Sequence, residues 1–385
     1  MLQRLIVLKE MLYLCNQNQS RMRTMWMLLF MGLPLLALSY IGWHIWCLLP
    51  LSAIWKTVVI IIMTGCFLLT FGNFSRAIDQ LSMPWAIVNY HIGTSSLIIL
   101  LYLFMLFLVL DLGRLMRLIP RTLLYNNWAT AGGIVVLMAA IFTYGYLHYK
   151  HKYREDIKLT TEKPMTKSLK LVMMSDLHLG YHNRREELHR WVDIINEEHA
   201  DAILIAGDII DMSVRPLKEE QMYEEFLRLN APVYACLGNH EYYSGEPDAQ
   251  KFYEQAGIHL LQDSCATVGD LCIVGRDDRT NLHRKTLADI MKQADHSKFT
   301  ILLDHQPYHL EQAERQRIDF QFSGHTHHGQ VWPISWITEA IYECAFGTHQ
   351  RGDTQYYVSS GIGIWGGKFR IGTRSEYVVV TISQK

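Results

Sequence analysis

Four long apolar stretches in the first 148 residues constrain this chain more than any other feature. They lie near residues 26–47, 53–72, 92–110 and 128–147, and about 20 apolar residues of helix are enough to cross the hydrocarbon core of a bilayer. The third and fourth stretches contain no charged residue. The sequence therefore predicts an all-α transmembrane anchor of about four helices over residues 1–148.

The ends of these stretches have the composition of a membrane–water boundary. Tryptophans gather there, as they do in the aromatic belts of membrane proteins: Trp26, Trp43, Trp46, Trp55, Trp85 and Trp128. Lys9 and Glu10 interrupt the apolar start of the chain, and no small-residue cleavage site follows. We therefore expect the first twenty residues to form an interfacial helix rather than a cleaved signal peptide.

The distribution of basic residues predicts the orientation of this anchor. An even number of spans, here four, would place the segment before the first span and the segment after the last on the same side of the membrane. That side carries most of the lysines and arginines near the spans, among them Arg21, Arg23, Lys150 and Lys152. Basic residues are enriched on the cytoplasmic side of membrane proteins. We therefore expect a multi-pass protein whose C-terminal half faces the cytoplasm.

The remainder of the chain has the composition of a soluble protein. Residues 149–167 are polar and charged and are predicted to form a linker, whereas strand and helix signals alternate over residues 168–385, which indicates an α/β domain. The net charge of the whole chain is −1, and basic residues do not interleave with aromatic ones. No nucleic-acid partner is therefore expected.

In this soluble half, five predicted strands end in side chains that bind metal ions. The carboxyl ends of strands in an open α/β sheet meet at one edge, so we expect these side chains to converge. Carboxylate, amide oxygen and neutral imidazole are the ligands that hard or borderline divalent cations prefer. The stretches are Asp176-Leu177-His178, Gly207-Asp208-Ile209-Ile210-Asp211, Gly238-Asn239-His240-Glu241, Asp304-His305 and Gly324-His325-Thr326-His327.

The spacing within these stretches favours two ions. Asp176 and His178 are two residues apart and can converge on one ion, and His325 and His327 repeat that spacing. Asp208 follows a glycine, and its carboxylate can bridge two ions. Taken alone, a histidine such as His305 would more often be a satisfied core residue. A ligand set of nitrogen and oxygen without thiolate admits manganese, iron, zinc or magnesium.

Taken in order, the motifs DLH, GDIID, GNHE, DHQP and GHTHHGQ resemble the calcineurin-like metallophosphoesterase family. The resemblance covers about residues 169–385 and implies a four-layer αββα sandwich with the site at one edge. It also implies two divalent metal ions that share one carboxylate, that of Asp208. By this resemblance the first ion is held by Asp176, His178, Asp208 and His327, and the second by Asp208, Asn239, His305 and His325.

The resemblance further implies how the reaction proceeds. A hydroxide that bridges the metals would attack phosphorus, His240 would donate a proton to the leaving oxygen, and Asp211 and Glu241 would orient the ligands. Two subfamilies are disfavoured. Asp211 stands where purple acid phosphatases would place a tyrosine ligand, and Met212 stands where Ser/Thr protein phosphatases carry arginine.

The C-terminal tail resembles that of bacterial, membrane-tethered members of the family. This implies an inner-membrane location and substrates such as phosphodiesters and nucleotide-lipid pyrophosphates. Arg370 and Arg374 lie in a glycine-rich loop of this tail and, with Asn239, are candidate phosphate contacts, although they could equally be solvated arginines at a strand end. The remaining histidines of the domain, His182 among them, are expected on the surface.

An apolar run with two tryptophans, residues 331–341, follows directly after two of the predicted ligands. It could form a wall for an acyl chain or dock the domain on the bilayer, and the alternative is ordinary core packing. A large exposed apolar patch at this place would favour the first two readings.

We therefore predict a membrane-anchored, dinuclear metal-dependent phosphoesterase that hydrolyses a phosphodiester or pyrophosphate bond, with lipid-linked molecules as candidate substrates. The expected partners are the lipid bilayer and a phosphate ester, and no specific protein partner is predicted. Two alternatives stay open. One is a broad phosphomonoesterase or nucleotide phosphodiesterase whose anchor serves only localisation. The other is a membrane receptor or scaffold with an inactive phosphoesterase fold.

Overall fold

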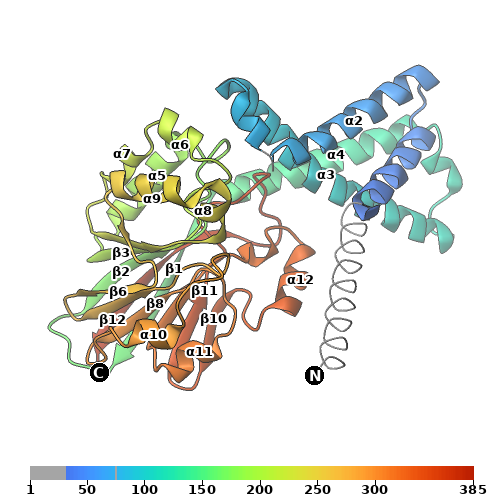
Figure 1. Ribbon diagram of the computed structural model, residues 1–385. Helices are drawn as coiled ribbons and strands as arrows, with labels where there is room; N and C mark the ends of the chain where they lie inside the picture. The colour runs from blue at the N-terminus through green and yellow to red at the C-terminus, as the bar shows by residue number, and fades with distance from the viewer. Residues whose placement is uncertain (1–31, 74–75) are drawn as a thin grey trace, which may run out of the picture. The chain divides into compact units, whose positions relative to one another are not determined.

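The computed structural model describes residues 32–73 and 76–385, which fall into two compact units. The described residues of the first unit lie within 32–67 and 96–139, and those of the second within 68–95 and 140–385. The first unit is helical, and its long helices continue into the second. These helices are α2 (Ala53–Asn73), α3 (Met83–Leu115) and α4 (Trp128–Lys150) (Figure 1).

Three helices in the described residues, α2, α3 and α4, are long and apolar enough to cross a membrane. They coincide with three of the four predicted spans. The remaining predicted span, 26–47, lies partly outside the described residues, and its described part is the shorter apolar helix Gly32–Leu48. The total of four spans stays a prediction. At 1.5 Å per residue, the 33 residues of α3 extend roughly 50 Å, which exceeds a hydrocarbon core of about 30 Å.

The second unit contains two six-stranded sheets. The order of strands in the first sheet is β1 (Lys152–Thr161), β12 (Ser375–Gln384), β2 (Leu169–Met174), β3 (Ala202–Ala206), β4 (Val233–Cys236) and β5 (His259–Leu260). The order in the second sheet is β10 (Gly347–Arg351), β11 (Thr354–Val358), β9 (Phe320–Ser323), β8 (Phe299–Leu303), β7 (Leu271–Gly275) and β6 (Ser264–Val268). Strands β2 to β5 run parallel, as do β7, β8 and β9.

The two sheets pack face to face, and helices cover their outer faces (Figure 1). Side chains alternate along a strand: Leu171 and Met173 of β2 enter the core between the sheets, whereas Val172 and Met174 enter the core beneath the helices. Because both faces are buried, the strands are apolar throughout. This arrangement confirms the predicted α/β class and the αββα sandwich.

The covering helices are short. Those outside the first sheet are α5 (Arg185–Glu197), α6 (Arg215–Glu219), α7 (Tyr223–Phe226) and α9 (Glu246–Gln255), and those outside the second are α10 (Leu287–Met291) and α11 (Glu311–Arg315). Helix α8 (Asn239–Ser244), helix α12 (Ile334–Ile341) and the 3-10 turn η3 (His327–Gly329) follow strand ends. Two further 3-10 turns, η1 (Arg76–Gln80) and η2 (Arg121–Leu124), precede α3 and α4.

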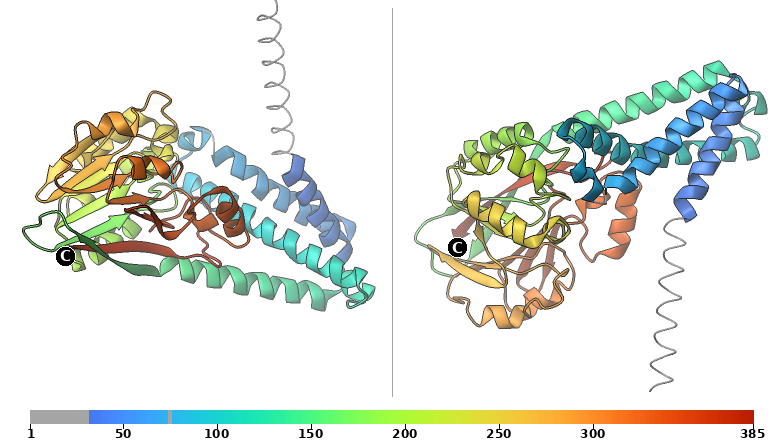
Figure 2. Two further views of the ribbon diagram at one scale, coloured as in Figure 1. Left: turned by 90° about the horizontal axis from the view of Figure 1, so that it is seen from below. Right: turned by 45° about the horizontal axis from the view of Figure 1, so that its top comes forward.

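The predicted linker over residues 149–167 was wrong for most of its length. Residues 152–161 form β1, which pairs in parallel with β12 over all ten of its residues, and Figure 2 shows the two strands side by side. Along β1, charged side chains alternate with partly or fully buried ones such as Ile157 and Leu159. The strand lies at the sheet edge, so only one of its faces is buried, and its charged face gives it the composition of a linker.

Candidate metal centre

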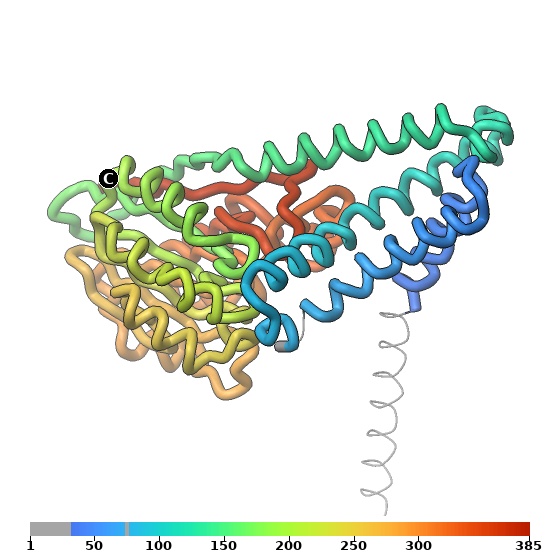
Figure 3. The backbone as a smooth tube through the Cα atoms, turned by 90° about the horizontal axis from the view of Figure 1, so that it is seen from above, coloured from blue at the N-terminus to red at the C-terminus, as the bar shows by residue number. Residues whose placement is uncertain are grey.

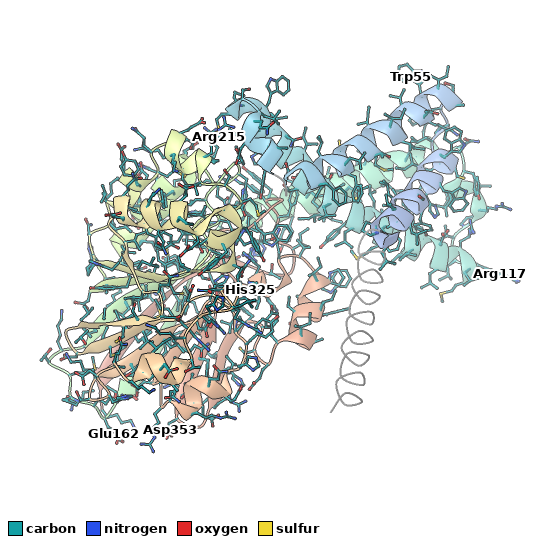
Figure 4. The ribbon with its side chains drawn as sticks, viewed as in Figure 1. Trp55, Arg117, Glu162, Arg215, His325 and Asp353 are labelled. Atoms are coloured by element: carbon teal, nitrogen blue, oxygen red, sulfur yellow. The ribbon has the colours of Figure 1, made fainter. Side chains whose placement is uncertain are left out.

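The predicted metal ligands meet where the two sheets present the carboxyl ends of their strands. Strands β2, β3 and β4 supply the ligands from the first sheet, and β8 and β9 supply those from the second. In Figure 4 the labelled His325 lies at this junction. The seven residues come from both sheets, so only the packed sandwich can bring them together.

One group of side chains gathers around His178. Its Nε2 atom lies 3.0 Å from Nε2 of His327 and 3.8 Å from Oδ1 of Asp176. Nε2 of His327 lies 3.4 Å from the same Asp176 oxygen. All three residues are buried. Their ligand atoms lie close enough together to surround one metal ion.

A second group gathers around His305. Its Nε2 atom lies 3.0 Å from Oδ2 of Asp208, and His325 belongs to the same cluster of potential ligands. The His325 Nδ1 atom is 2.8 Å from Oδ1 of Asn239. Asp208 also reaches the first group, because its Oδ2 atom lies 3.6 Å from Nε2 of His178. The structure therefore brings all seven predicted ligands together and places Asp208 between the two groups.

The hydrogen bonds of His305 indicate that a cation belongs between its ring and Asp208. His305 Nδ1 lies 2.7 Å from the carbonyl oxygen of Ala206, and only a protonated Nδ1 can donate to that oxygen. In the neutral ring, Nε2 then presents a lone pair to the Asp208 carboxylate, and this buried nitrogen has no hydrogen-bond partner. Two acceptors at 3.0 Å repel each other, so a cation belongs between them: a proton on Nε2, which Asp208 favours by raising the pKa of His305 against the effect of burial, or a metal ion in its place. Ligands about 2.1 Å from an ion are about 3 Å apart, as these atoms are.

The backbone supports the same interpretation. Five of the seven ligands have positive φ angles, between 45° and 70°, a region that residues other than glycine rarely occupy. Each such residue costs on the order of 1–3 kcal/mol and persists where the surrounding structure enforces it, commonly at functional sites. The five are Asp176, His178, Asp208, His325 and His327.

Close packing of the strand-end loops holds these turns in place. Gly207 has a φ of 74°, and a Cβ atom at Gly238 would overlap the Asp208 carboxylate. Glu241, which is fully buried, joins the two loops: its carboxylate accepts hydrogen bonds from the backbone N–H groups of Asp208, Ile210 and Gly238, at 3.1, 3.0 and 2.7 Å. Glu241 thus fixes the loop that carries Asp208, as an orienting residue should.

Asp211 orients two histidines. Its Oδ1 atom lies 3.2 Å from Nδ1 of His178 and 3.3 Å from Nδ1 of His240. The contact with His178 is a hydrogen bond of the kind that fixes the tautomer of a metal-binding histidine and leaves Nε2 free for the metal. The backbone N–H of His240 donates to Oδ1 of Asp208 at 2.9 Å. His240 is only partly buried, so its ring lies at the solvent side of the ligand set.

The electrostatics of the pocket suit metal binding. Burial lowers the pKa of His325 to about 4, with His305 adding to the effect, and burial also lowers the pKa of His327 well below its usual value. His325 and His327 are therefore neutral, the form that binds metal. Burial also opposes the charged form of His178 and His305, but the carboxylates of Asp176, Asp211 and Asp208 outweigh it and raise the pKa of His178 to about 10 and that of His305 well above its usual value, so a metal ion would displace a proton from these two rings. Burial would raise the pKa of Asp176 and Asp208, but neighbouring histidines outweigh it and both pKa values fall. The carboxylates are consequently ionised.

The structure contradicts the predicted substrate contact of Arg370 and pairs Arg374 with carboxylates. Arg370 is completely buried, and its guanidinium donates to the backbone carbonyls of His327, Ser360 and Gly363. Arg374 is paired with the carboxylates of Glu155 and Glu376. The Arg370 guanidinium is therefore unavailable to a phosphate, whereas that of Arg374 is a third exposed but already paired with two carboxylates. Asn239, the third predicted contact, lies among the metal ligands, next to His325.

His182 was also placed wrongly by the sequence, which predicted a surface residue. It is 2% exposed, and its Nε2 atom lies 2.5 Å from the carbonyl oxygen of Ile364. Its ring stacks on Tyr90, a residue near the start of α3. Tyr90 contributes to the surroundings of the metal centre, and no sequence signal indicated it, because the tyrosine lies in an apolar helix far from the motifs.

Comparison with known proteins agrees with this geometry. Residues 169–329 match the family described as calcineurin-like phosphoesterase. An uncharacterized metallophosphoesterase of Aquifex aeolicus is 30% identical over 66% of this chain and 98% of its own length. The chain therefore belongs to the calcineurin-like metallophosphoesterase family.

Two other relatives match different shares of the chain. An uncharacterized metallophosphoesterase of Helicobacter pylori strain J99 is 32% identical over 57% of this chain, and the match spans 61% of that relative. A protein of Danio rerio named transmembrane protein with metallophosphoesterase domain is 29% identical over 73% of this chain and 70% of its own length.

Proposed function

We propose that this protein is a membrane-anchored, dinuclear metal-dependent phosphoesterase that hydrolyses a phosphodiester or pyrophosphate bond. The observation that carries the proposal is the position of Asp208, within 3.6 Å of a nitrogen of each ligand group. Two bound divalent ions would supply Lewis acidity, which makes water nucleophilic at neutral pH and neutralises charge on the phosphoryl oxygens. The identity of the metal is open among manganese, iron, zinc and magnesium.

The protein side chains account for the remaining requirements of the reaction. The seven ligands would hold the ions, and His240 lies beside them at the solvent side. Its Nδ1 atom lies 3.3 Å from Oδ1 of Asp211, so its other nitrogen, Nε2, would be the one to donate a proton to the leaving oxygen of the ester.

An exposed apolar surface next to the metal centre supports a substrate in the membrane. Helix α12 begins shortly after the ligands His325 and His327, and several large apolar side chains on and beside it are exposed. The exposed fractions are 43% for Trp332, 61% for Trp336, 57% for Ile337 and 59% for Ile341. These four residues are here called the α12 surface. Such a patch favours an interaction site over core packing.

The contacts of Trp332 support our proposal that the bilayer occupies the α12 surface. The backbone N–H of Trp332 donates to the carbonyl of Ile371 at 2.7 Å, and Ile371 packs against Gly145 so closely that a Cβ there would lie 2.9 Å from it. Gly145 belongs to α4, a candidate membrane span. The α12 surface therefore lies beside the end of a membrane helix, where tryptophan and isoleucine can enter the lipid interface.

A substrate that is itself embedded in the bilayer explains this arrangement. A phosphodiester or pyrophosphate in an amphipathic lipid could reach the metal centre along the α12 surface without leaving the membrane. The basic residues that flank the predicted spans support a position of this centre at the cytoplasmic leaflet, and the resemblance to bacterial membrane-tethered members favours the inner membrane.

Activity of the full-length protein in lipid nanodiscs, loaded with Mn²⁺, tests the proposal. The substrates are a nucleotide-lipid pyrophosphate in the nanodisc, a water-soluble bis-aryl phosphodiester and an aryl phosphomonoester. We expect turnover of the pyrophosphate or the diester to exceed that of the monoester, and Asp208→Ala to abolish both. Preference for the monoester would support the broad phosphomonoesterase instead. Absence of turnover in metal-loaded protein would support the scaffold.

The α12 surface is tested separately by Trp336→Ser combined with Ile337→Ser. We expect this variant to turn over the lipid substrate at least tenfold more slowly while its turnover of the soluble diester stays within twofold of wild type. Leu227→Ser is the matched control, since Leu227 is equally exposed, at 59%, but lies beyond α7 in the outer helical layer. Equal loss on both substrates would contradict a role in lipid access.

A further inference from the structure

The carboxylate of Asp211 receives a hydrogen bond from a membrane helix. Its Oδ1 atom faces His178 and His240, as described above, and its Oδ2 atom accepts a hydrogen bond of 2.6 Å from the hydroxyl of Tyr90. Both residues are nearly inaccessible, with exposed fractions of 2% for Asp211 and 3% for Tyr90. Tyr90 lies in the first turns of α3, a candidate membrane span.

The start of α3 is firmly packed on the catalytic half. The hydroxyl of Tyr181 donates to the side chain of Asp79 at 2.5 Å, and the guanidinium of Arg215 donates to the carbonyls of Asp79 and Leu81 at 2.6 and 2.7 Å. Tyr90 itself stacks on His182, with ring centroids 4.8 Å apart. Figure 3 shows the turn before α3 next to the helices of the catalytic half, and in Figure 4 the labelled Arg215 lies beside it.

Tyr90 is the group that fixes the second oxygen of Asp211. The next candidate, Nδ1 of His182, lies 4.0 Å from that oxygen, beyond hydrogen-bond reach. The Tyr90 hydroxyl is in turn oriented by the backbone N–H of Gly366, which donates to it at 3.3 Å. With Oδ2 held in this way, rotation of the carboxylate is restricted, and Oδ1 stays directed at the two imidazoles.

We propose that Tyr90 is a positioning residue through which helix α3 sets the geometry of the metal centre. The inference rests on the proposed metal-dependent function. Tyr90 acts through Asp211, which in turn orients the ligand His178 and the proton donor His240. A metal-binding histidine is oriented by the partner of its other nitrogen, and loss of such partners typically weakens metal binding 10- to 100-fold. The anchor would thus complete the metal centre in addition to attaching it to the membrane.

Tyr90→Phe tests this inference, because it removes one oxygen atom and keeps the ring. Metal-free, full-length protein in detergent is titrated with Mn²⁺, and the dissociation constants are measured by calorimetry. We expect the affinity of the metal site that contains His178 to fall 10- to 100-fold in Tyr90→Phe. Tyr181→Phe is the matched control, since it also removes a tyrosine hydroxyl that donates to a carboxylate, that of Asp79 in η1 just before α3. The affinity of this variant for Mn²⁺ should stay within twofold of wild type.

A merely structural role for Tyr90 predicts a different result. In that case Tyr90→Phe and Tyr181→Phe would lower the melting temperature of the metal-free protein alike, and neither would change the affinity for Mn²⁺. An unchanged affinity in Tyr90→Phe would overturn the inference.

A double-mutant comparison keeps the inference testable if Tyr90→Phe is poorly stable. Because Tyr90 acts through Asp211, Tyr90→Phe should cause less than a twofold further loss of Mn²⁺ affinity in an Asp211→Asn background. If the two substitutions lowered the affinity for Mn²⁺ independently, so that their fold losses multiplied in the double variant, the inference would be contradicted. Because metal affinity is measured without substrate, the role of Tyr90 can be tested separately from the proposed function. Wild-type protein that binds Mn²⁺ but hydrolyses no phosphate ester would refute that function, and the affinity ratio would still decide the role of Tyr90.

Discussion

Replacing Arg370 with methionine should destabilise the catalytic half rather than weaken substrate binding. Arg370 is completely buried, and it donates to the carbonyls of His327 at 2.7 Å, Gly363 at 3.1 Å and Ser360, and to Oγ of Ser375 at 3.2 Å. It therefore joins the ligand turn at His327 to the glycine-rich tail and to the start of β12. Methionine keeps much of the volume but donates no hydrogen bond.

The size of the effect follows from these contacts. A buried polar group left without its partner costs about 1–3 kcal/mol, and methionine leaves three carbonyls in that state. Removing a buried charge offsets part of this, since burial lowers the pKa of Arg370 to about 10 and so already disfavours the cation. We expect a net loss of roughly 3–5 kcal/mol in the free energy of unfolding. For a domain of this size, that lowers the melting temperature by roughly 6–20 °C.

Thermal unfolding of the full-length protein in detergent, followed by tryptophan fluorescence, measures this loss. Arg374→Met is a useful comparison, because Arg374 is a third exposed and pairs with Glu155 and Glu376 near the edge of the sheet, so its loss should be smaller. If Arg370→Met unfolded within about 1 kcal/mol of wild type but raised KM for the phosphate ester, Arg370 would be a substrate contact. The scaffold role assigned to it would then be refuted.

Two further changes test other parts of the structure. Gly238→Ala should abolish binding of Mn²⁺ in calorimetry, because the added Cβ would overlap the Asp208 carboxylate; wild-type affinity would show that this contact can relax. For Glu198, burial would raise the pKa, but Arg154 and Lys170 lower it to about 2. Its stabilisation is therefore present above the unfolded-state pKa of about 4.5 and disappears as the pH falls toward 2. Glu198→Gln should cost about 1–2 kcal/mol at pH 7, allowing for solvent screening, and nothing near pH 2. A difference that stays constant in denaturation curves across this range would contradict the assignment.

The metal ligands could be predicted from the sequence because each follows an apolar strand. Asp176, Asp208 and His305 come directly or almost directly after runs that are buried on both faces, and such runs are conspicuous in a sequence. Parallel strands place their carboxyl ends at a common edge, so the convergence follows from topology. The αββα layers likewise follow from the alternation of strands and helices together with the resemblance carried by the motifs.

What the sequence did not reveal depends on contacts between distant segments. Strand β1 has one buried face and many charges, so its composition is that of a linker, and only its pairing with β12 makes it a strand. Arg370 lies in a glycine-rich loop, where an arginine could bind phosphate equally well. Its role is decided by three carbonyls that the fold brings around it. Tyr90 belongs to an apolar helix, and its hydrogen bond to Asp211 spans 121 positions.

The central claim is that Asp208 belongs to two metal sites at once. Elemental analysis of the full-length protein, loaded with Mn²⁺ and passed through a desalting column, tests this claim most directly. We predict two ions per chain in wild type, about one in His325→Ala, and none in Asp208→Ala. A single ion in wild type, or an Asp208→Ala variant that retains one tightly bound ion, would contradict the claim.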